Sequence, residues 1–157
     1  MNFPDFPDLG PEATDPGIFF HFEDVSIDFP SETAVSEWLE AAAENEGKPL
    51  GEVTYIFCSD EYLHKMNVEH LAHDDYTDVI TFPYSDERIE GDVFISIERV
   101  RENAASVAAS FHHELCRVMI HGLLHLAGHS DKTAELRAAM SEWEDFYLKK
   151  LDKKGVF

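Results

Sequence analysis

Two histidines stand four residues apart in an apolar run, within the segment HGLLHLAGHSD that covers residues 121–131. On a helix, His121 and His125 project from one face about 6 Å apart along the axis. Their ring nitrogens can then reach one ion with bonds of about 2 Å. On a continuous helix His129 would stand about 12 Å from His121, too far to share that ion. The spacing predicts a metal site with two helical histidines and a third ligand from elsewhere.

Gly128 offers a route to the third ligand. Glycine readily takes the left-handed conformation that ends a helix and turns the chain aside. In metzincin-type zinc motifs the third ligand stands three residues after such a glycine, and that position here is Asp131. We predict His121, His125 and Asp131 as the ligands, with His129 at the rim of the site or exposed. The alternative is a packing helix whose histidines bind no metal.

The residue after the first histidine separates this motif from one class of metalloenzyme. Proteases with the HExxH motif use its glutamate as the general base, and here Gly122 takes that position. We therefore do not expect a protease of that mechanism. A small residue at this point leaves space beside the metal, either for a bulky substrate or for a close approach of another backbone.

The chain is strongly acidic, with 32 acidic residues, 12 basic residues and a formal net charge of -20. Such a field repels polyanions over a screening length, so the composition argues against non-specific binding to nucleic acid or anionic membranes. Two interpretations of the acidity stay open. One is solubility, and the other is adaptation to a salt-rich cytoplasm in which ions screen the repulsion.

A length of 157 residues with 44% hydrophobic content indicates one compact domain. We expect residues 1–17, rich in Pro, Asp and Gly, to form a flexible lead, and residues 18–157 to form the domain. The first residues lack the basic and apolar regions of a signal peptide, and no run reaches the roughly 18 apolar residues of a membrane span. We predict a cytoplasmic protein in which Cys58 and Cys116, without CxxC spacing, are buried thiols.

Strand patterns fill the first half of the chain and helix patterns the second. We predict strands over 25–29, 51–58, 77–83 and 91–97, the last two joined as a hairpin by the charged segment 85–90. We predict helices over 31–46, 60–68, 98–110, 111–128 and 132–151, with Ser59 and Thr133 as N-caps and Gly47 as a stop. This order favours an α+β fold over a regular βαβ alternation.

The motif and two further segments resemble one known family. The segment ELCRVMIHGLLHLAGHSD resembles the signature of the YbeY family, which usually reads H-G-x-L-H-L-x-G-x-D-H. TDVITFPY and GDVFISIERV resemble the family's T-D-V-L-S-F-P segment and G-D-I strand, and the blocks follow in the same order from about Gly51 to Trp143. The resemblance implies a zincin-like fold, with a small mixed β-sheet flanked by helices and the metal motif on a central helix.

By the same resemblance, the family's first two ligand histidines fall on His121 and His125. Its third ligand position falls on Asp131, where most members carry His. A carboxylate there removes one unit of positive charge from the site, which makes the metal a weaker Lewis acid. We expect one divalent metal, Zn²⁺ first, with Fe²⁺, Mn²⁺ and Ni²⁺ as alternatives.

A second departure concerns phosphate binding. The family usually has an Arg at the RNA-binding cleft six residues before the Thr of its T-D-V segment, and here that position is Leu71. If a cation is needed to hold phosphate, it must come from His70, His73 or Arg117, or catalysis is weak. The alternative for the two histidines is a role as solvated loop residues.

Three residues are candidates for catalytic roles, and the sequence names no general base among them. Glu114 can orient a ligand or pair structurally with Arg117, and we favour the pairing. Asp78 can support the site or cap its strand. His73 is the third candidate.

We predict a metal-dependent, single-strand-specific endoribonuclease that matures the 3′ end of small-subunit rRNA and serves ribosome quality control. Its partners would be rRNA in the small subunit and ribosome-associated proteins, with no membrane. One alternative is a non-catalytic ribosome-assembly factor with a structural metal, which the missing Arg and the acidity favour. A three-ligand site favours the enzyme, because structural zinc usually has four protein ligands. A hydrolase of a small molecule or peptide has only fold analogy behind it.

Overall fold

The computed structural model describes residues 15–29, 31–72 and 76–154. Within them four strands and five helices follow one another along the chain. Their bounds are β1 (Gly17–Phe22), α1 (Glu32–Glu46), β2 (Leu50–Cys58), α2 (Asp60–Leu71), β3 (Val79–Pro83), β4 (Ile89–Ser96), α3 (Ile97–Ser106), α4 (Phe111–Leu126) and α5 (Ala134–Asp152).

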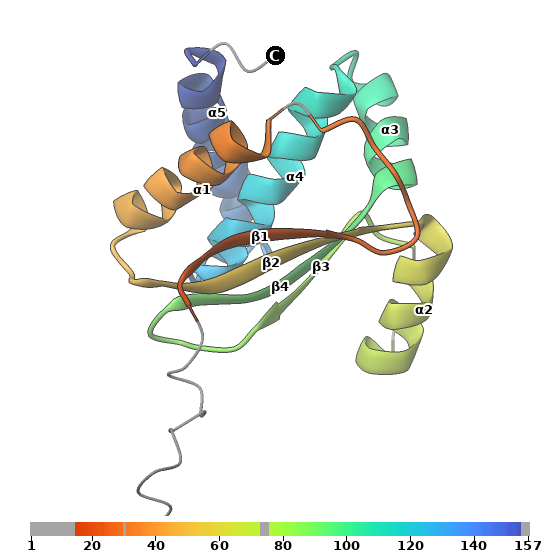
Figure 1. Cartoon of the computed structure of the whole chain (residues 1–157), viewed down its shortest axis with the longest axis horizontal. Coiled ribbons are helices and arrows are strands. Elements are labelled where there is room, and N and C mark those ends of the chain that lie inside the picture. Colours follow the sequence, from red (N-terminus) through yellow and green to blue (C-terminus); the bar gives the residue numbers. More distant parts are fainter. Residues whose placement is uncertain (1–14, 30, 73–75, 155–157) are drawn as a thin grey trace, which may run out of the picture.

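The strands form one mixed sheet in the order β1-β2-β4-β3. The pairs β1–β2 and β2–β4 are parallel, whereas β3 and β4 form the predicted antiparallel hairpin. Helices α1, α4 and α5 lie over one face of the sheet (Figure 1). Helix α2 packs on part of the other face, where Leu63 joins Cys58 and Ile80 in a small apolar cluster. The predicted α+β class, with helices around a small mixed sheet, is confirmed.

Side-chain caps explain where the predicted helices begin. The Ser59 side chain accepts from the backbone N–H of Tyr62, and Thr133 accepts from that of Leu136, so both predicted N-caps are confirmed. Gly47 ends α1 in the left-handed conformation, with a φ of 82°. The predicted helix over 60–68 continues to Leu71.

The predicted strand over 25–29 is wrong. The first strand is Gly17–Phe22, which pairs in parallel with β2 and places Phe20 opposite Tyr55. Val25, Ile27 and Phe29 alternate because their side chains pack against the core from a segment that pairs with no strand of the described chain. Residues 1–14 of the predicted lead lie outside the described residues, and β1 already begins at Gly17.

Helix α4 runs through the middle of the core. Its residues Leu115, Met119, Ile120 and Leu123 are fully buried. A Cβ atom on Gly122 would stand 2.6 Å from Cγ1 of Val93, so helix and sheet touch at this point. The small residue makes room for neither a substrate nor another backbone, the two reasons considered, but for the side chain of Val93, which packs directly on the helix backbone.

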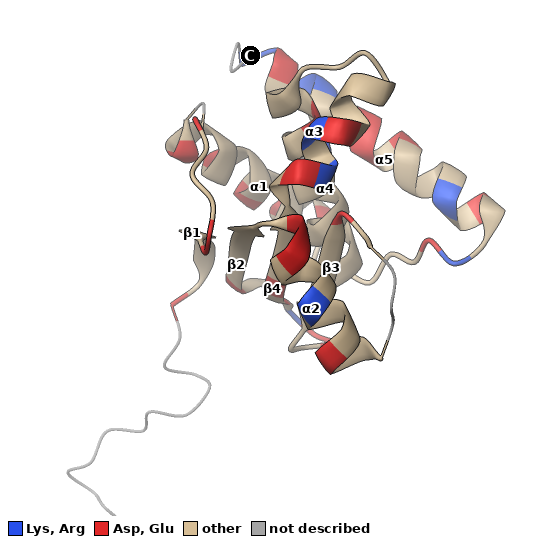
Figure 2. Cartoon of the chain, turned by 90° about the vertical axis from the view of Figure 1, so that its right-hand side faces the viewer, with Lys and Arg blue, Asp and Glu red and all other residues tan. Residues whose placement is uncertain are grey.

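The two thiols are buried as predicted, at Cys58 and Cys116. Burial raises the pKa of each to about 12, with smaller contributions from nearby acidic side chains. Acidic residues are spread over the helices, whereas basic residues are fewer (Figure 2). No helix in the described part of the chain is long and apolar enough to cross a bilayer.

Candidate metal centre

The last turns of α4 carry both histidines of the motif. Ser110 caps the start of this helix, and the helix ends at Leu126, one residue after His125. The two rings meet at an angle of 83°, and their Nε2 atoms lie 3.0 Å apart. Both side chains are largely buried, so the helix presents two converging nitrogen atoms at a sheltered point.

The chain turns at Gly128 and returns to the histidines. Gly128 has a φ of 107°, and the N–H of His129 bonds the carbonyl of Leu124 at 2.9 Å, which closes the end of the helix. Oδ2 of Asp131 then lies 3.4 Å from Nε2 of His125 and 3.6 Å from Nε2 of His121. The structure brings the three predicted residues together, with one ligand atom of each within 4.8 Å of the others.

The outer ring nitrogens fix which atoms face inward. Nδ1 of His121 lies 2.7 Å from Oε2 of Glu144, and Nδ1 of His125 lies 3.0 Å from the carbonyl oxygen of His129. A carboxylate and a carbonyl only accept, so each Nδ1 carries a hydrogen, and whenever the ring is neutral its Nε2 lone pair points inward.

This donor set fits a cation. Two lone pairs and a carboxylate oxygen, 3.0 to 3.6 Å apart, repel one another unless positive charge lies between them. A tetrahedral zinc ion with bonds of about 2.0–2.1 Å holds its ligand atoms about 3.3 Å apart. The spacing and the tautomers therefore both suit one divalent ion.

The surroundings shift the pKa values of the two histidines in opposite directions. Burial alone would lower the pKa of His121, but the hydrogen bond and charge of Glu144, with the charges of Asp131 and Asp78, raise it overall. Burial and the charge of His121 lower the pKa of His125, against the opposing charge of Asp131. The carboxylates thus favour positive charge at His121, the residue that they surround.

His129 adjoins the site and is only partly exposed. Nε2 of its side chain, which is 32% exposed, lies 2.6 Å from Oε1 of Glu46 on α1. The hydroxyl of Tyr147 donates to the other oxygen of Glu46. His129 therefore links the loop after α4 to α1 and α5, while its carbonyl orients His125.

A cavity of about 350 Å³ opens beside the donor atoms. It is lined chiefly by polar side chains, namely Asp78, Glu114, Arg117, His121, Asp131, Arg137, Ser141 and Glu144. Asp78 accepts a hydrogen bond from Asn103 at 3.3 Å, and burial raises its pKa. Burial likewise raises the pKa of Glu114, which is only 8% exposed. Two of the three predicted catalytic candidates thus meet in one cavity; the third, His73, lies outside the described residues.

The sequence comparison decides the family. The family described as endoribonuclease YbeY matches residues 18–152 of this chain. The chain belongs to the YbeY family. Membership supports an RNA-processing nuclease.

Individual relatives agree with the family match. The chain is 47% identical over 130 residues to endoribonuclease YbeY of Flavobacterium johnsoniae, an alignment that covers 82% of this chain and 92% of the relative. It is 50% identical over 109 residues to endoribonuclease YbeY of Christiangramia forsetii, covering 69% and 76%. Among solved structures, the fold is similar to the solution structure of TM1509 from Thermotoga maritima, with a TM-score of 0.64 and 27% identity over 87% of this chain and 90% of that one.

Two arginine side chains, Arg117 and Arg137, line the cavity of this YbeY member. Arg117 donates to Oε1 of Glu144 at 3.0 Å and to Asp145 at 2.7 Å, and its predicted pairing with Glu114 is limited to its charge, which lowers the pKa of Glu114 against the larger effect of burial. Arg137 lines the cavity and is exposed, and it donates a long hydrogen bond of 3.5 Å to the carbonyl of Asp131. The sequence analysis missed Arg137 as a cation for phosphate.

Two residues near the end of α2, His70 and Leu71, bear on the missing cation and lie outside the cavity lining. Leu71 is the last residue of α2 and is 41% exposed, so its position holds an apolar side chain at the surface. His70 is exposed and meets the ring of Phe82 edge-on, with centroids 6.3 Å apart. Neither residue lines the cavity beside the donor atoms.

Glu144 is the other residue that the sequence analysis missed. On α5 it lies in line with the buried Met140, Tyr147, Leu148 and Leu151. A carboxylate on the apolar stripe of an amphipathic helix is costly to bury unless it has partners. The glutamate on this apolar stripe was the feature of the sequence that could have indicated a functional residue. Its partners are His121 and Arg117.

Proposed function

We propose that this YbeY member is a metal-dependent endoribonuclease, specific for single strands, that matures the 3′ end of small-subunit rRNA and serves ribosome quality control. The observation that supports this most is the convergence of three donor atoms beside a polar cavity. Structural zinc usually has four protein ligands, whereas the group formed by the described residues has three. An ion held by these three residues would have a further coordination position for a substrate or water.

His121, His125 and Asp131 would hold the ion, with Zn²⁺ as the first candidate and Fe²⁺, Mn²⁺ and Ni²⁺ as alternatives. When bound, a divalent ion polarises a phosphoryl oxygen or lowers the pKa of a water molecule. Glu144 and the carbonyl of His129 keep both rings in the tautomer that presents Nε2.

Glu114 is our choice for the residue that moves a proton in the cavity. Its carboxylate has no hydrogen-bond donor among the described residues. No fully buried side-chain N or O atom in that part of the chain lacks a hydrogen-bond partner, so the oxygens of Glu114 are not fully buried. Because Glu114 lines the cavity, these oxygens face the cavity space. Asp78 is less suited, because Asn103 already donates to it. Arg137 is the cation best placed to hold a phosphate, since both hydrogen-bonding arms of Arg117 go to carboxylates. His73 stays a candidate from the sequence.

The proposed setting is the cytoplasm, with rRNA of the small subunit and ribosome-associated proteins as partners. A chain with a net charge of -20 repels RNA at long range. Binding should therefore depend on short-range contacts in the cavity, and salt should help the encounter by screening the repulsion.

The test compares wild type with His125→Ala for metal content by elemental analysis and for cleavage of a single-stranded RNA. We expect about one metal equivalent in wild type, and loss of both metal and cleavage in the variant. His21→Ala, which removes an exposed histidine bonded to Glu23, is the matched control and should change neither property. Full metal content and full cleavage in His125→Ala would refute the proposal.

A second function has support from the acidic surface and from Leu71, which stands where the family usually has an arginine. In it the chain is a ribosome-assembly factor whose metal only joins the Asp131 loop to α4. Metal-loaded wild type is then expected to cleave no single-stranded RNA at any salt concentration, while His125→Ala still loses metal and melts at a lower temperature. Cleavage by wild type that disappears in Glu114→Gln, with metal content unchanged, would exclude this second function.

A further inference from the structure

Strand β1 leaves one edge of the sheet unpaired. In the order β1-β2-β4-β3 it has a neighbour on one side, and no backbone bond from another described segment reaches its outer side. The N–H of Glu23 bonds the carbonyl of Phe57, so odd-numbered residues direct their backbone groups toward β2. Because these groups alternate, the N–H and C=O groups of Ile18, Phe20 and Phe22 face outward. Such an edge is a template for an added strand.

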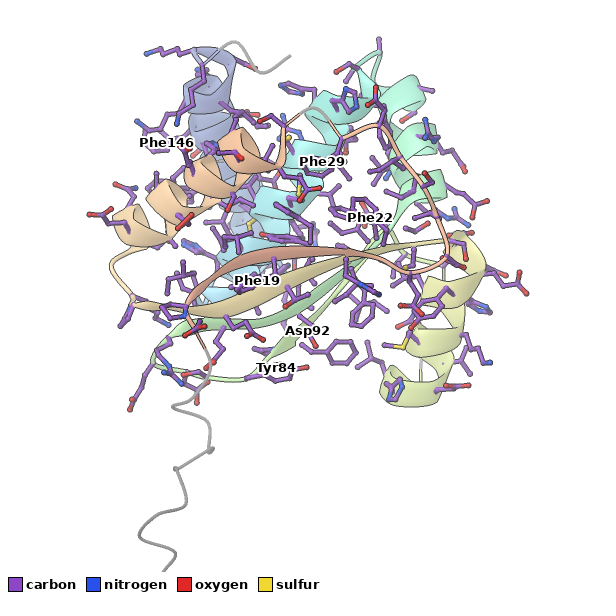
Figure 3. All side chains as sticks on the ribbon, in the orientation of Figure 1. Phe19, Phe22, Phe29, Tyr84, Asp92 and Phe146 are labelled. Atoms are coloured by element: carbon purple, nitrogen blue, oxygen red, sulfur yellow. The ribbon has the colours of Figure 1, made fainter. Side chains whose placement is uncertain are left out.

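A groove of about 450 Å³ runs along this edge, between β1 and α1. Its floor includes Ile18, Phe19 and Phe20, and its wall includes Glu32, Glu37 and Glu40 from α1. The side chain of Phe19 is 43% exposed, at the front of the sheet in Figure 3. The groove therefore has an apolar strand on one side and carboxylates on the other.

The wall of the groove is negatively charged and lacks balancing cations. Glu32, Glu37 and Glu40 are exposed, and none of the described basic side chains forms an ion pair with them. Among the described residues, the hydrogen bond to this set is from Ser36 to Glu40, at 3.4 Å. Charge complementarity then selects a basic occupant.

We infer that this groove binds an extended, basic segment of a partner protein, which adds a strand to β1. Side chains of a strand alternate between two faces. Lys or Arg at every second position would meet the glutamates of α1, and apolar side chains between them would cover Phe19. The inference concerns a surface apart from the metal centre and does not depend on the proposed nuclease activity.

Two other occupants fit the groove less well. Residues 1–14 of the same chain carry Asp5, Asp8 and Glu12 and three prolines, so they would bring like charge and missing N–H donors to the edge. A second copy that paired through β1 would bring two glutamate walls together. A basic strand from another protein meets neither obstacle.

The experiment measures binding of a fluorescein-labelled peptide Lys-Val-Arg-Val-Lys-Val-Arg to the full chain by fluorescence anisotropy. We expect Glu37→Gln/Glu40→Gln to weaken binding by about tenfold. Glu61→Gln/Glu69→Gln, which removes the same charge from exposed positions on α2, should leave it within about twofold. Equal weakening in both double variants would mean non-specific attraction to an acidic protein and would overturn the inference.

Backbone pairing has its own test, with two peptides of that sequence N-methylated either at the Lys and Arg residues or at the Val residues. In an added strand only one of the two sets points its N–H groups at β1. We expect one methylated peptide to lose binding, the Lys/Arg form for an antiparallel strand and the Val form for a parallel one. An equal effect of both methylations, absence of peptide binding, or elution of the free chain as a dimer through this edge would each overturn the inference.

Discussion

At the scale of single residues, Glu144 connects the donor histidines to the rest of the molecule. One of its oxygens accepts from Nδ1 of His121, and the other accepts from Arg117. Glu144→Gln replaces one acceptor oxygen with an NH₂ group that cannot accept, which weakens control over the His121 tautomer. We expect metal affinity to fall by about 10- to 100-fold, measured by competition with a chelating dye.

Asp145→Asn is the control for this variant. It removes the other carboxylate that binds Arg117 and leaves Glu144 in place, so metal affinity should stay close to that of wild type. If both variants weakened the metal equally, the effect would come from Arg117 and not from the support of His121.

Glu114 makes stability depend on pH in a direction that its burial fixes. Burial raises its pKa above the ordinary value of 4.5, so the folded state holds this proton more tightly than the unfolded state. The free energy of unfolding then loses this contribution as pH rises from 4.5 through the raised value. We expect metal-free Glu114→Gln to be more stable than wild type at pH 8, with a difference that shrinks toward pH 4, measured by urea unfolding.

Glu142→Gln, at an exposed position on α5, should show no such pH-dependent difference from wild type. A Glu114→Gln variant that is less stable than wild type at pH 8 would show that the ionised carboxylate is stabilised in the folded state, which contradicts our reading of its burial.

At the scale of elements, local signals predicted the helices well and the first strand poorly. Ser59 and Thr133 mark helix starts because an N-cap is a local hydrogen bond between residues three apart. Strand pairing is not local. The alternation of Val25, Ile27 and Phe29 reflects burial against the core, whereas β1 is defined by its partner β2, some 35 residues further along the chain, as Gly17 opposite Glu52 shows.

The candidate site likewise has one part that local sequence patterns predict and one part that they do not. The approach of His121, His125 and Asp131 follows from helix spacing and from one glycine turn, and both are visible in the sequence. Glu144 and Arg137 reach the site only through the packing of α5 on α4. A contact across two helices depends on their docking, which no local pattern specifies.

The contact between α4 and β4 leads to a prediction about packing. Gly122→Ala places a methyl carbon 2.6 Å from Cγ1 of Val93, a fully buried side chain with little freedom to move. Overpacking of this kind costs about 1–3 kcal/mol, and the better helix propensity of alanine offsets up to about 1 kcal/mol of it. We expect a net loss of stability in urea unfolding.

The double variant Gly122→Ala/Val93→Ala supplies the control. Removal of the Val93 methyl groups makes room for the new one, so the two changes should be less destabilising together than the sum of their separate effects. Simple additivity would mean that helix and sheet move apart freely and that the close approach is unimportant.

At the scale of the whole molecule, net charge should govern how stability responds to salt. A charge of -20 on 157 residues makes the folded state repel itself, and ions screen that repulsion. We expect the melting temperature to rise between about 0.05 and 0.5 M NaCl by an amount equivalent to about 1 kcal/mol, measured by differential scanning fluorimetry.

KCl at the same ionic strength should act like NaCl, because screening depends on ionic strength and not on the identity of the cation. A melting temperature that stays flat or falls over this range would show that local ion pairs, such as Arg99 with Asp60, outweigh the global repulsion.

The position of α4 also sets how long the donor set persists once formed. His121 and His125 belong to a helix that packs against α3, α5, α1 and two strands. Asp131 belongs to the loop between α4 and α5 and is more exposed than either histidine. Local opening needs least free energy where few buried contacts must break. The complete site therefore persists only while the loop that carries Asp131 stays closed on α4. The two histidines keep their positions for as long as the core stays folded.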